Sequence, residues 1–328
     1  MKLALAGDTM LGRGVAARLA NAPPTSLFAD EVVAAAREAD LFVLNLECAV
    51  SDRGEPWPDP FKAFFFRAPP VAVEVLRHLG VDCVTLANNH ALDFGADALA
   101  DTLRHLAGTG IAWVGAGPDE TAARSPAILE RSGLRLGVVG VTDHPRQYAA
   151  GRDRPGVAYA DLCHGRPPWL LDTIGSLDTD IVLVSPHWGP NMVAEPVEHV
   201  RSAAAAFRTA GATLVAGHSA HVFHGVDDGV LYDLGDFIAD YATHPDLRND
   251  LGLLFLVTFD DARPVRLEVV PLALDFCHTR LADREEAAWI TRRFRRACAP
   301  FGTEVTRHGD RLVVECQRSA PGRGEPCG

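Results

Sequence analysis

Short runs of almost entirely apolar residues alternate with helix-like segments through residues 3–216 of this chain. The helical pattern is clearest in one segment, where Leu99, Leu103 and Leu106 recur at i, i+4 and i+7. Because nearly every residue of the apolar runs is nonpolar, both faces of the sheet that they form must be covered, which predicts an α/β fold. The predicted strands are 3–6, 41–46, 83–87, 136–141, 181–184 and 213–216, and the predicted helices are 31–39, 70–79, 96–107 and 197–210.

The pattern changes after about residue 230. Three further apolar runs, 230–232, 253–259 and 265–274, follow without long helices between them, so we expect antiparallel strands there. We predict a domain over residues 1–275 and, packed on it, a C-terminal helix (283–299) and a hairpin around residues 308–310 within residues 276–317. Residues 318–328 are rich in Gly, Pro and Arg, and we predict that they form a disordered tail.

Composition excludes several classes of partner. The net charge is −12 and lysine occurs only at positions 2 and 62, so we expect no binding of nucleic acid. The seven cysteines are scattered and include no Cys-x-x-Cys pair, which is typical of buried thiols in a reducing compartment. No apolar stretch reaches the length of about 18 residues that spans a bilayer. We therefore expect a cytoplasmic protein without a membrane anchor, and the sequence indicates no particular oligomeric state.

Residues able to bind a metal follow five of the predicted strands, at the point where each apolar run ends. Ligands of open α/β sheets collect beyond the carboxyl ends of the strands, so these residues should converge if the strands are parallel neighbours. Carboxylates, an amide oxygen and imidazoles together make a mixed nitrogen and oxygen site that suits Mn, Fe or Zn. The predicted ligands are Asp8, Glu47, Asn89, His187, His218 and His221.

Each of these residues also has a simpler interpretation. Asp8 in Gly-Asp-Thr could cap a helix, Asn89 could be a turn residue, and His187 beside Trp188 could be a packed loop histidine. Glu47 is harder to explain in this way, because a carboxylate directly after an apolar strand is expensive to bury without a partner. The joint occurrence of these residues at successive strand ends favours a metal site.

Eight motifs, in order along residues 1 to about 275, resemble the capsule-biosynthesis CapA, or poly-γ-glutamate synthesis, family, a branch of the calcineurin-like metallophosphatase superfamily. The resemblance implies a four-layer αββα sandwich of mixed sheets with a metal centre at the strand ends. The motifs are GDTMLGR (7–13), NLECAV (45–50), FRAPP (66–70), LANNHALDFG (86–95), GAG (115–117), SPHWG (185–189), GHSAHVFHGV (217–226) and YDLGDFI (232–238).

The resemblance also implies roles for individual residues. Asp8 and His221 would bind one divalent ion, Glu47 would bridge, and Asn89, His187 and His218 would hold a second ion, with Mn, Fe or Zn as the metal. His90 would not bind metal but would act as a general acid toward the leaving group. Asp93, three residues later, would fix the tautomer of His90 and raise its basicity.

The chain departs from the superfamily pattern in three motifs. Met10 stands where phosphatases usually have a histidine, Glu47 replaces the usual Asp, and two residues instead of one separate His218 from His221. Asp233 and Asp236 replace the Ser and Asn common in the family and could alter the charge preference for substrate. Phosphatase activity therefore cannot be carried over from the superfamily.

Four further residues are candidates for substrate binding. Arg13 and Arg67 could hold an anionic group, because a guanidinium matches carboxylate or phosphate geometry, or could form ordinary ion pairs. Asp143 and His144 follow the strand 136–141 and could line the same pocket, or could simply form the turn before Pro145. We expect a small-molecule or peptide-like anionic substrate.

The leading hypothesis is a metal-dependent hydrolase, in which a metal-activated water attacks a phosphoester or a γ-glutamyl or peptide-like amide. The alternative is a non-hydrolytic protein that binds or assembles poly-γ-glutamate or another capsule polymer and carries a vestigial metal site. A third reading is an interaction domain whose site has decayed.

Overall fold

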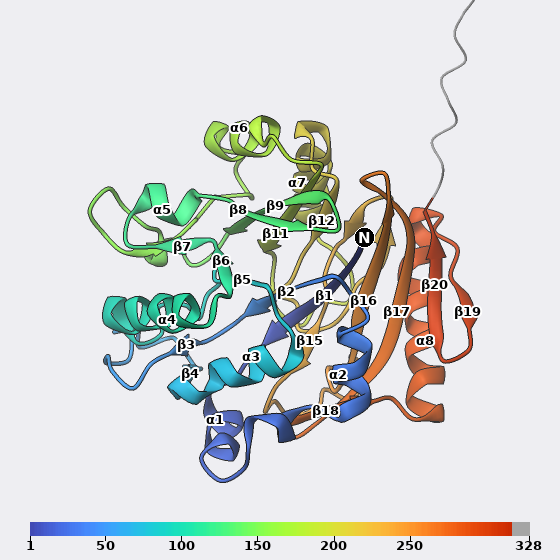
Figure 1. Cartoon of the computed structure of the whole chain (residues 1–328), viewed down its shortest axis with the longest axis horizontal. Helices are drawn as coiled ribbons and strands as arrows, with labels where there is room; N and C mark the ends of the chain where they lie inside the picture. The colour runs from blue at the N-terminus through green and yellow to red at the C-terminus, as the bar shows by residue number, and fades with distance from the viewer. Residues whose placement is uncertain (317–328) are drawn as a thin grey trace, which may run out of the picture.

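The computed structural model describes residues 1–316, in which two mixed β-sheets lie face to face (Figure 1). In the first sheet β1, β2, β5 and β6 are parallel, and β15 lies parallel to β1. The remaining neighbours in this sheet are antiparallel, as predicted for strands 253–259 and 265–274. The predicted strand 230–232 instead pairs in parallel within the second sheet. Its order is β19 (Thr306–His308), β20 (Arg311–Glu315), β17 (Arg263–Asp275), β16 (Leu251–Asp260), β1 (Lys2–Thr9), β2 (Leu41–Leu46), β5 (Cys83–Thr85) and β6 (Ala112–Val114), with β15 (Asp236–Ile238) beside β1 and β18 (His278–Leu281) beside β17.

The second sheet has a parallel centre formed by β9, β11, β12 and β14, with an antiparallel strand at each edge. Its order is β13 (Val226–Asp227), β14 (Val230–Leu231), β12 (Leu214–Ala216), β11 (Ile181–His187), β9 (Leu134–Thr142) and β8 (Ala127–Arg131). Two short strand pairs lie outside these sheets. In one, β3 (Ala49–Val50) pairs with β4 (Arg67–Ala68), and in the other β7 (Ala116–Gly117) pairs with β10 (Gly156–Val157).

Helices cover the outer face of each sheet, which makes four layers. Alternate residues of β1 show the arrangement: Leu3 and Leu5 belong to the core between the sheets, while Ala4 and Ala6 belong to the core beneath the helices. This two-sided burial explains why the strand is apolar throughout. The first sheet is covered by α1 (Arg13–Leu19), α2 (Asp30–Ala36), α3 (Val73–Leu79) and α4 (Gly95–Thr109), and the second by α6 (Pro168–Ser176) and α7 (Glu198–Ala210), while α5 (Glu120–Arg124) packs on β7 and β10. The predicted αββα sandwich is confirmed.

The segment after residue 275 is continuous with the first sheet. Strands β18 and β20 both pair with β17, and the predicted hairpin is formed by β19 and β20. The predicted C-terminal helix is α8 (Arg284–Cys298), which begins with a capping box at Asp283. Its residues Ile290 and Phe294 lie in the core between the two sheets. The division at residue 275 stays a prediction, and the predicted disordered tail lies outside the described residues.

The predicted strands and helices are all present, with two differences that affect the site. Strand β1 extends to Thr9 and β11 extends to His187, so Asp8 and His187 lie within strands instead of following them. The short helices α1, α5 and α6 were not predicted. Within residues 1–316, no helix combines the length and the apolar character needed to cross a bilayer.

Candidate metal centre

The predicted metal-binding residues of the two sheets meet where the parallel strands end. Asp8 on β1 and Glu47 after β2 come from the first sheet, while His187 on β11 and His218 after β12 come from the second. His187 and His218 are themselves joined by a parallel β-bridge, and all four residues are buried. The predicted convergence of these residues is therefore present in the structure.

Asp8 lies at the centre of the cluster. It forms one group with His187 and His218 and another with Glu47 and His221, and in each group the potential ligand atoms lie within 4.8 Å of one another. Asp8 Oδ2 is 3.2 Å from His221 Nδ1, and Asp8 Oδ1 is 3.9 Å from His218 Nδ1. The family resemblance gave the bridging role to Glu47, but the residue that the two groups share is Asp8.

His187 and His218 turn ring nitrogens toward each other. Their Nδ1 atoms are 2.9 Å apart, and Ser185 Oγ is 3.1 Å from His218 Nε2. Burial holds the pKa of His187 well below its usual value and lowers the pKa of His218 to about 4. Both rings are therefore neutral at pH 7, which is the form in which an imidazole binds a metal.

The loop that carries His218 and His221 has an unusual backbone. Ser219 and His221 both have positive φ angles, 122° and 58°. The Ser219 amide donates to Asp8 Oδ2 at 3.2 Å, and the Ala220 amide donates to Asp233 Oδ2 at 2.8 Å. Such strained conformations persist only where surrounding contacts impose them, and here those contacts fix both histidines against Asp8.

Asp233 and Asp236 hold this loop in place through hydrogen bonds. Asp233 also accepts from the Gly235 amide at 2.8 Å, and His221 Nδ1 donates to Asp236 Oδ1 at 2.8 Å. Both carboxylates are 2% exposed, buried like the other residues of the cluster, and their effect on the charge preference for substrate stays a prediction. Burial opposes protonation of His221, but Asp236 and Asp8 raise its pKa well above the usual value.

Asn45, within β2, was not predicted to belong to the site. Its Nδ2 donates to Asp8 Oδ1 at 2.7 Å and lies 3.3 Å from Glu47 Oε2, so one amide group joins the two carboxylates. Asn88 in turn donates to Asn45 Oδ1 at 2.9 Å and accepts from the His90 amide at 3.0 Å. A polar side chain inside an otherwise apolar strand was the signal for this role.

The donors present fit a divalent cation. Burial and the nearby charge of Asp8 raise the pKa of Glu47 well above its usual value, and Glu47 Oε1 has no hydrogen-bond partner among the described residues. The Oδ1 atom of Asn89 is likewise buried without a partner. Burial disfavours ionised Asp8, yet the hydrogen bond and charge of His221 hold the pKa of Asp8 below its usual range. Unpartnered acceptors beside neutral imidazoles are what a bound cation would satisfy.

His90 and Asp93 form a hydrogen-bonded pair at the edge of the cluster. His90 Nδ1 donates to Asp93 Oδ2 at 2.6 Å, which leaves Nε2 facing Glu47 Oε1 at 3.7 Å. Burial lowers the pKa of His90 although Asp93 acts in the opposite direction. The Phe66 amide donates to Asp93 Oδ2 at 2.6 Å, and the Tyr148 hydroxyl donates to Oδ1 at 3.2 Å. Asp93 is thus held in place and orients His90.

Lys62 was also missed by the sequence reasoning. Its Nζ lies 2.9 Å from Asp93 Oδ1 and donates to the Asn89 carbonyl at 2.8 Å, and its side chain is only 14% exposed. The signal was its rarity, because this is one of only two lysines in the chain. The cation lies beside the His90–Asp93 pair.

A scan against protein-family models gives a match over residues 2–241, which include all the predicted metal ligands together with His90 and Asp93. The matching model is the bacterial capsule synthesis protein PGA_cap. The chain belongs to the PGA_cap family.

Curated relatives of this PGA_cap chain carry names from polymer synthesis. A probable polyglutamine synthesis accessory protein of Mycobacterium tuberculosis (strain ATCC 25618 / H37Rv) is 32% identical over 296 residues, which cover 84% of this chain and 76% of the relative. The PGA biosynthesis protein CapA of Bacillus subtilis (strain 168) is 29% identical over 242 residues, or 71% of this chain and 62% of the relative. The expected CapA resemblance is confirmed.

Solved structures are more distant. A 5'-nucleotidase from Candida albicans SC5314 aligns with 11% identity and a TM-score of 0.43, covering 84% of this chain and 51% of that one. A similarity at this level does not bear on activity.

The two predicted substrate-binding arginines of this PGA_cap chain are engaged with other groups. Arg13 lies 3.3 Å from Asp240 Oδ2 and over the ring of Phe64 at 4.8 Å. Arg67 donates to the carbonyl of Gly54 at 3.1 Å and lies over the Phe94 ring at 4.2 Å. Their roles in substrate binding stay predictions.

Asp143 and His144 lie close to the centre. The His144 ring is 5.1 Å from the His187 ring, and His144 donates to Asp143 through Nδ1. The other carboxylate oxygen of Asp143 accepts from the Gly189 amide at 3.0 Å and from His199 Nε2 at 3.1 Å. His144 can therefore line the site, whereas Asp143 is turned toward His199.

A cavity of about 220 Å³ adjoins the centre. The segment that carries Lys62 and the turn after β9 form much of its wall. The lining residues are Trp57, Asp59, Phe61, Lys62, Asn89, His144, Pro145, Gln147 and Tyr148. Neither Arg13 nor Arg67 lines it.

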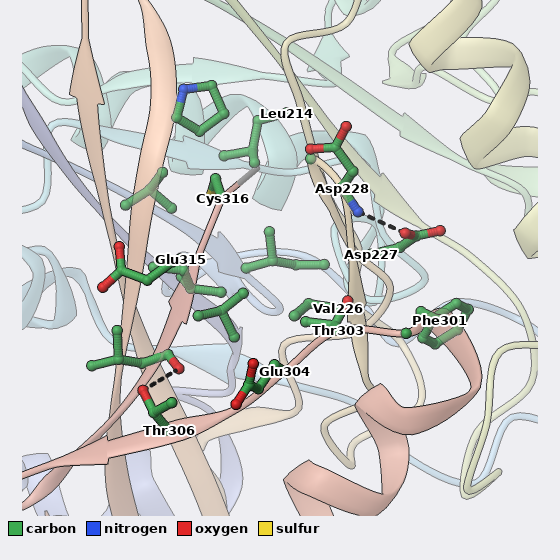
Figure 2. Close-up of a pocket in the computed structure, with 18 residues that line it drawn as sticks. Leu214, Val226, Asp227, Asp228, Phe301, Thr303, Glu304, Thr306, Glu315 and Cys316 are labelled. Carbon is green, nitrogen blue, oxygen red and sulfur yellow. Dashed lines mark hydrogen bonds between the residues drawn. The ribbon is translucent and has the colours of Figure 1, made fainter. Parts of the chain in front are cut away.

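A larger cavity of about 510 Å³ lies elsewhere. Figure 2 shows its lining, which includes Leu214 at the amino end of β12, the acidic residues Asp227 and Asp228, and Glu304. None of the predicted site residues lines it, so cavity size alone does not locate the centre.

Proposed function

We propose that this PGA_cap chain is a metal-dependent hydrolase that cleaves a phosphoester or a γ-glutamyl or peptide-like amide in an anionic substrate. One observation carries the proposal. His90, oriented by Asp93, presents its free ring nitrogen to the same buried cluster of carboxylates and neutral imidazoles that fits a divalent cation. Such a pairing of a metal-binding cluster with a positioned proton donor is typical of metal-assisted hydrolysis.

The residues of this chain would hold the metal as two overlapping groups, Asp8 with His187 and His218, and Asp8 with Glu47 and His221. Mn, Fe or Zn suits these nitrogen and oxygen donors. When bound, such an ion supplies a Lewis acid that polarises the substrate and lowers the pKa of water.

His90 would donate a proton from Nε2 to the leaving group. The hydrogen bond from Nδ1 to Asp93 fixes the ring in the orientation that turns Nε2 toward Glu47. Asp93 favours the protonated ring, but burial outweighs it and lowers the pKa of His90, so Nε2 would take up a proton from the attacking water before donating it to the leaving group. This is the arrangement that a general acid requires.

The adjoining cavity would receive the substrate. Its lining joins Lys62 to His144 and Asn89 and thus connects the proton donor with the edge of the metal cluster. Lys62, although paired with Asp93, is the cation in this lining, and Trp57 and Tyr148 supply aromatic surface.

The names of the relatives support a second candidate function. A synthesis accessory protein in Mycobacterium tuberculosis and a PGA biosynthesis protein in Bacillus subtilis are compatible with a chain that binds or assembles a capsule polymer without hydrolysing it. In that case the same cluster would hold metal without turnover.

One experiment separates the two functions. Chelator-treated protein is reloaded with Mn, Zn or Fe and assayed against a panel of phosphoesters and γ-glutamyl amides. We expect metal to restore turnover and His90→Ala to lower kcat by about a hundredfold or more while metal content is unchanged. His308→Ala, at an exposed position on β19, is the matched control and should retain full activity. Absence of turnover with every metal and substrate would favour the binding function.

A further inference from the structure

Three side chains with different metal-binding groups meet outside the main cluster. Asp143 follows β9, Cys163 lies in the segment between β10 and α6, and His199 is the second residue of α7. One carboxylate oxygen, the thiol sulfur and one imidazole nitrogen all lie within 4.8 Å of one another. Because these residues are far apart in the sequence, the fold itself brings them together.

The geometry of two of them already suits a shared cation. Asp143 Oδ2 and His199 Nε2 are 3.1 Å apart. A separation of this size corresponds to an angle of roughly 100° at a cation about 2.0 Å from each atom, close to the tetrahedral angle that zinc prefers. Asp143 is held in this position by the Gly189 amide and by His144.

Cys163 adds a sulfur donor that faces solvent. It is the one exposed cysteine among the described residues, whereas Cys48, Cys83, Cys277 and Cys298 are buried. Neighbouring His164 is engaged with Asp161 at 2.9 Å and so does not compete for the sulfur. The exposed side of the cluster leaves room for a fourth ligand such as water.

We propose that Asp143, Cys163 and His199 form a second metal site, which binds zinc. A set of one thiolate, one imidazole and one carboxylate favours zinc over the harder cations Mg and Mn. Binding releases the thiol proton to solvent and involves no change of oxidation state. The main cluster holds no sulfur, so the two sites differ in chemistry.

The proposed site lies directly behind the main centre. The Asp143 amide donates to the His187 carbonyl at 3.1 Å, and Asp143 also holds the His144 ring that lies against His187. Zinc bound to Asp143 would therefore fix His144 at the edge of the 220 Å³ cavity. The proposal does not depend on hydrolase activity, because none of its three ligands belongs to the main groups.

Cobalt tests the site directly, since Co²⁺ replaces Zn²⁺ and shows a thiolate charge-transfer band in the near ultraviolet. Chelator-treated full-length protein is titrated with Co²⁺ alone. We expect the band to rise to a plateau, at one equivalent in Asp8→Asn, whose main cluster no longer takes up metal, and to disappear when Zn²⁺ is added. It should be absent in Cys163→Ser, but retained in Cys316→Ser and in Asp8→Asn, which alters only the main cluster. A band that persists in Cys163→Ser, or no band in the wild-type protein, would overturn the proposal.

Alkylation of Cys163, followed by mass spectrometry, provides a readout independent of cobalt. Zn²⁺ should slow the modification of Cys163 by about tenfold or more, because a metal-bound thiolate is a weaker nucleophile and is less accessible. His199→Ala should remove most of this protection while Cys163 still reacts. Equal rates with and without Zn²⁺ would show that Asp143 and His199 form only a hydrogen-bonded pair.

Discussion

Lys62 forms a buried ion pair with Asp93, the residue that orients His90, and breaking this pair should be costly. The two charged atoms are 2.9 Å apart, with the side chains 14% and 0% exposed. At an effective dielectric constant of about 20, attraction at this distance is roughly 6 kcal/mol before the cost of desolvation is subtracted. Removing one partner leaves the other charge buried, which typically costs about 3–5 kcal/mol.

We therefore predict that Asp93→Asn lowers the free energy of unfolding by about 3–5 kcal/mol. The amide keeps an oxygen that can accept from the Phe66 amide, so the loss comes mainly from Lys62 and His90. Lys62→Met should also destabilise, because Asp93 then lacks its cation. In the double variant, the decrease in the free energy of unfolding should be smaller than the sum of the two single decreases by at least about 1.5 kcal/mol.

Denaturant unfolding of the metal-free single and double variants measures this coupling. The exposed pair formed by Glu74 and Arg77, 3.1 Å apart on α3, is the matched control. The same cycle with Glu74→Gln and Arg77→Met should give a coupling of no more than about 0.5 kcal/mol. If the losses for Lys62 and Asp93 add to within about 0.5 kcal/mol, the two residues are not coupled and the reasoning is refuted.

Two other predictions concern stability. Burial holds the pKa of His218 at about 4, below its value in the unfolded state. Between these two pKa values the unfolded state binds more protons than the folded state. Metal-free protein should therefore lose about 3 kcal/mol of stability as the pH falls from 6.5 to 4. In His218→Gln this part of the pH dependence should vanish in denaturant titrations, and an unchanged slope would contradict it. Gly217→Ala should destabilise by about 2 kcal/mol or more, since its Cβ would overlap the Tyr232 carbonyl oxygen and the Trp188 indole nitrogen. Gly108→Ala on α4, where nothing lies within 4 Å, should instead be neutral or stabilising, and equal melting temperatures for the two variants would oppose the prediction.

Much of the fold and of the site could be predicted, because burial leaves a clear pattern. Strand β2 was placed correctly over residues 41–46, since a strand covered on both faces must be apolar throughout. Glu47 and His218 follow such runs, and a polar group there needs a partner, which is why their convergence could be foreseen. The short helix α6 was missed because its nine residues are too few to show a sustained helical repeat.

Other parts depended on contacts between distant segments, which periodicity does not encode. Asn45 links two carboxylates from inside a strand, and Asp236 supports His221 from a strand added beside β1. The meeting of Cys163 and His199 with Asp143 follows from the packing of two loops against the start of α7. The contacts that these residues make can be identified only from the three-dimensional structure.

Metal content of the wild-type protein and of Asp8→Asn is the most direct test of the central claim that the strand ends form a divalent metal centre. Each protein is stripped with chelator, incubated with Mn²⁺, which the thiol-containing cluster does not favour, and analysed for bound metal by elemental analysis. Asp8 belongs to both groups of ligands, so the wild-type protein should bind one or two ions and Asp8→Asn should bind none. Equal binding by the two proteins, or none by the wild-type protein with Mn²⁺, Fe²⁺ or Zn²⁺, would contradict the account.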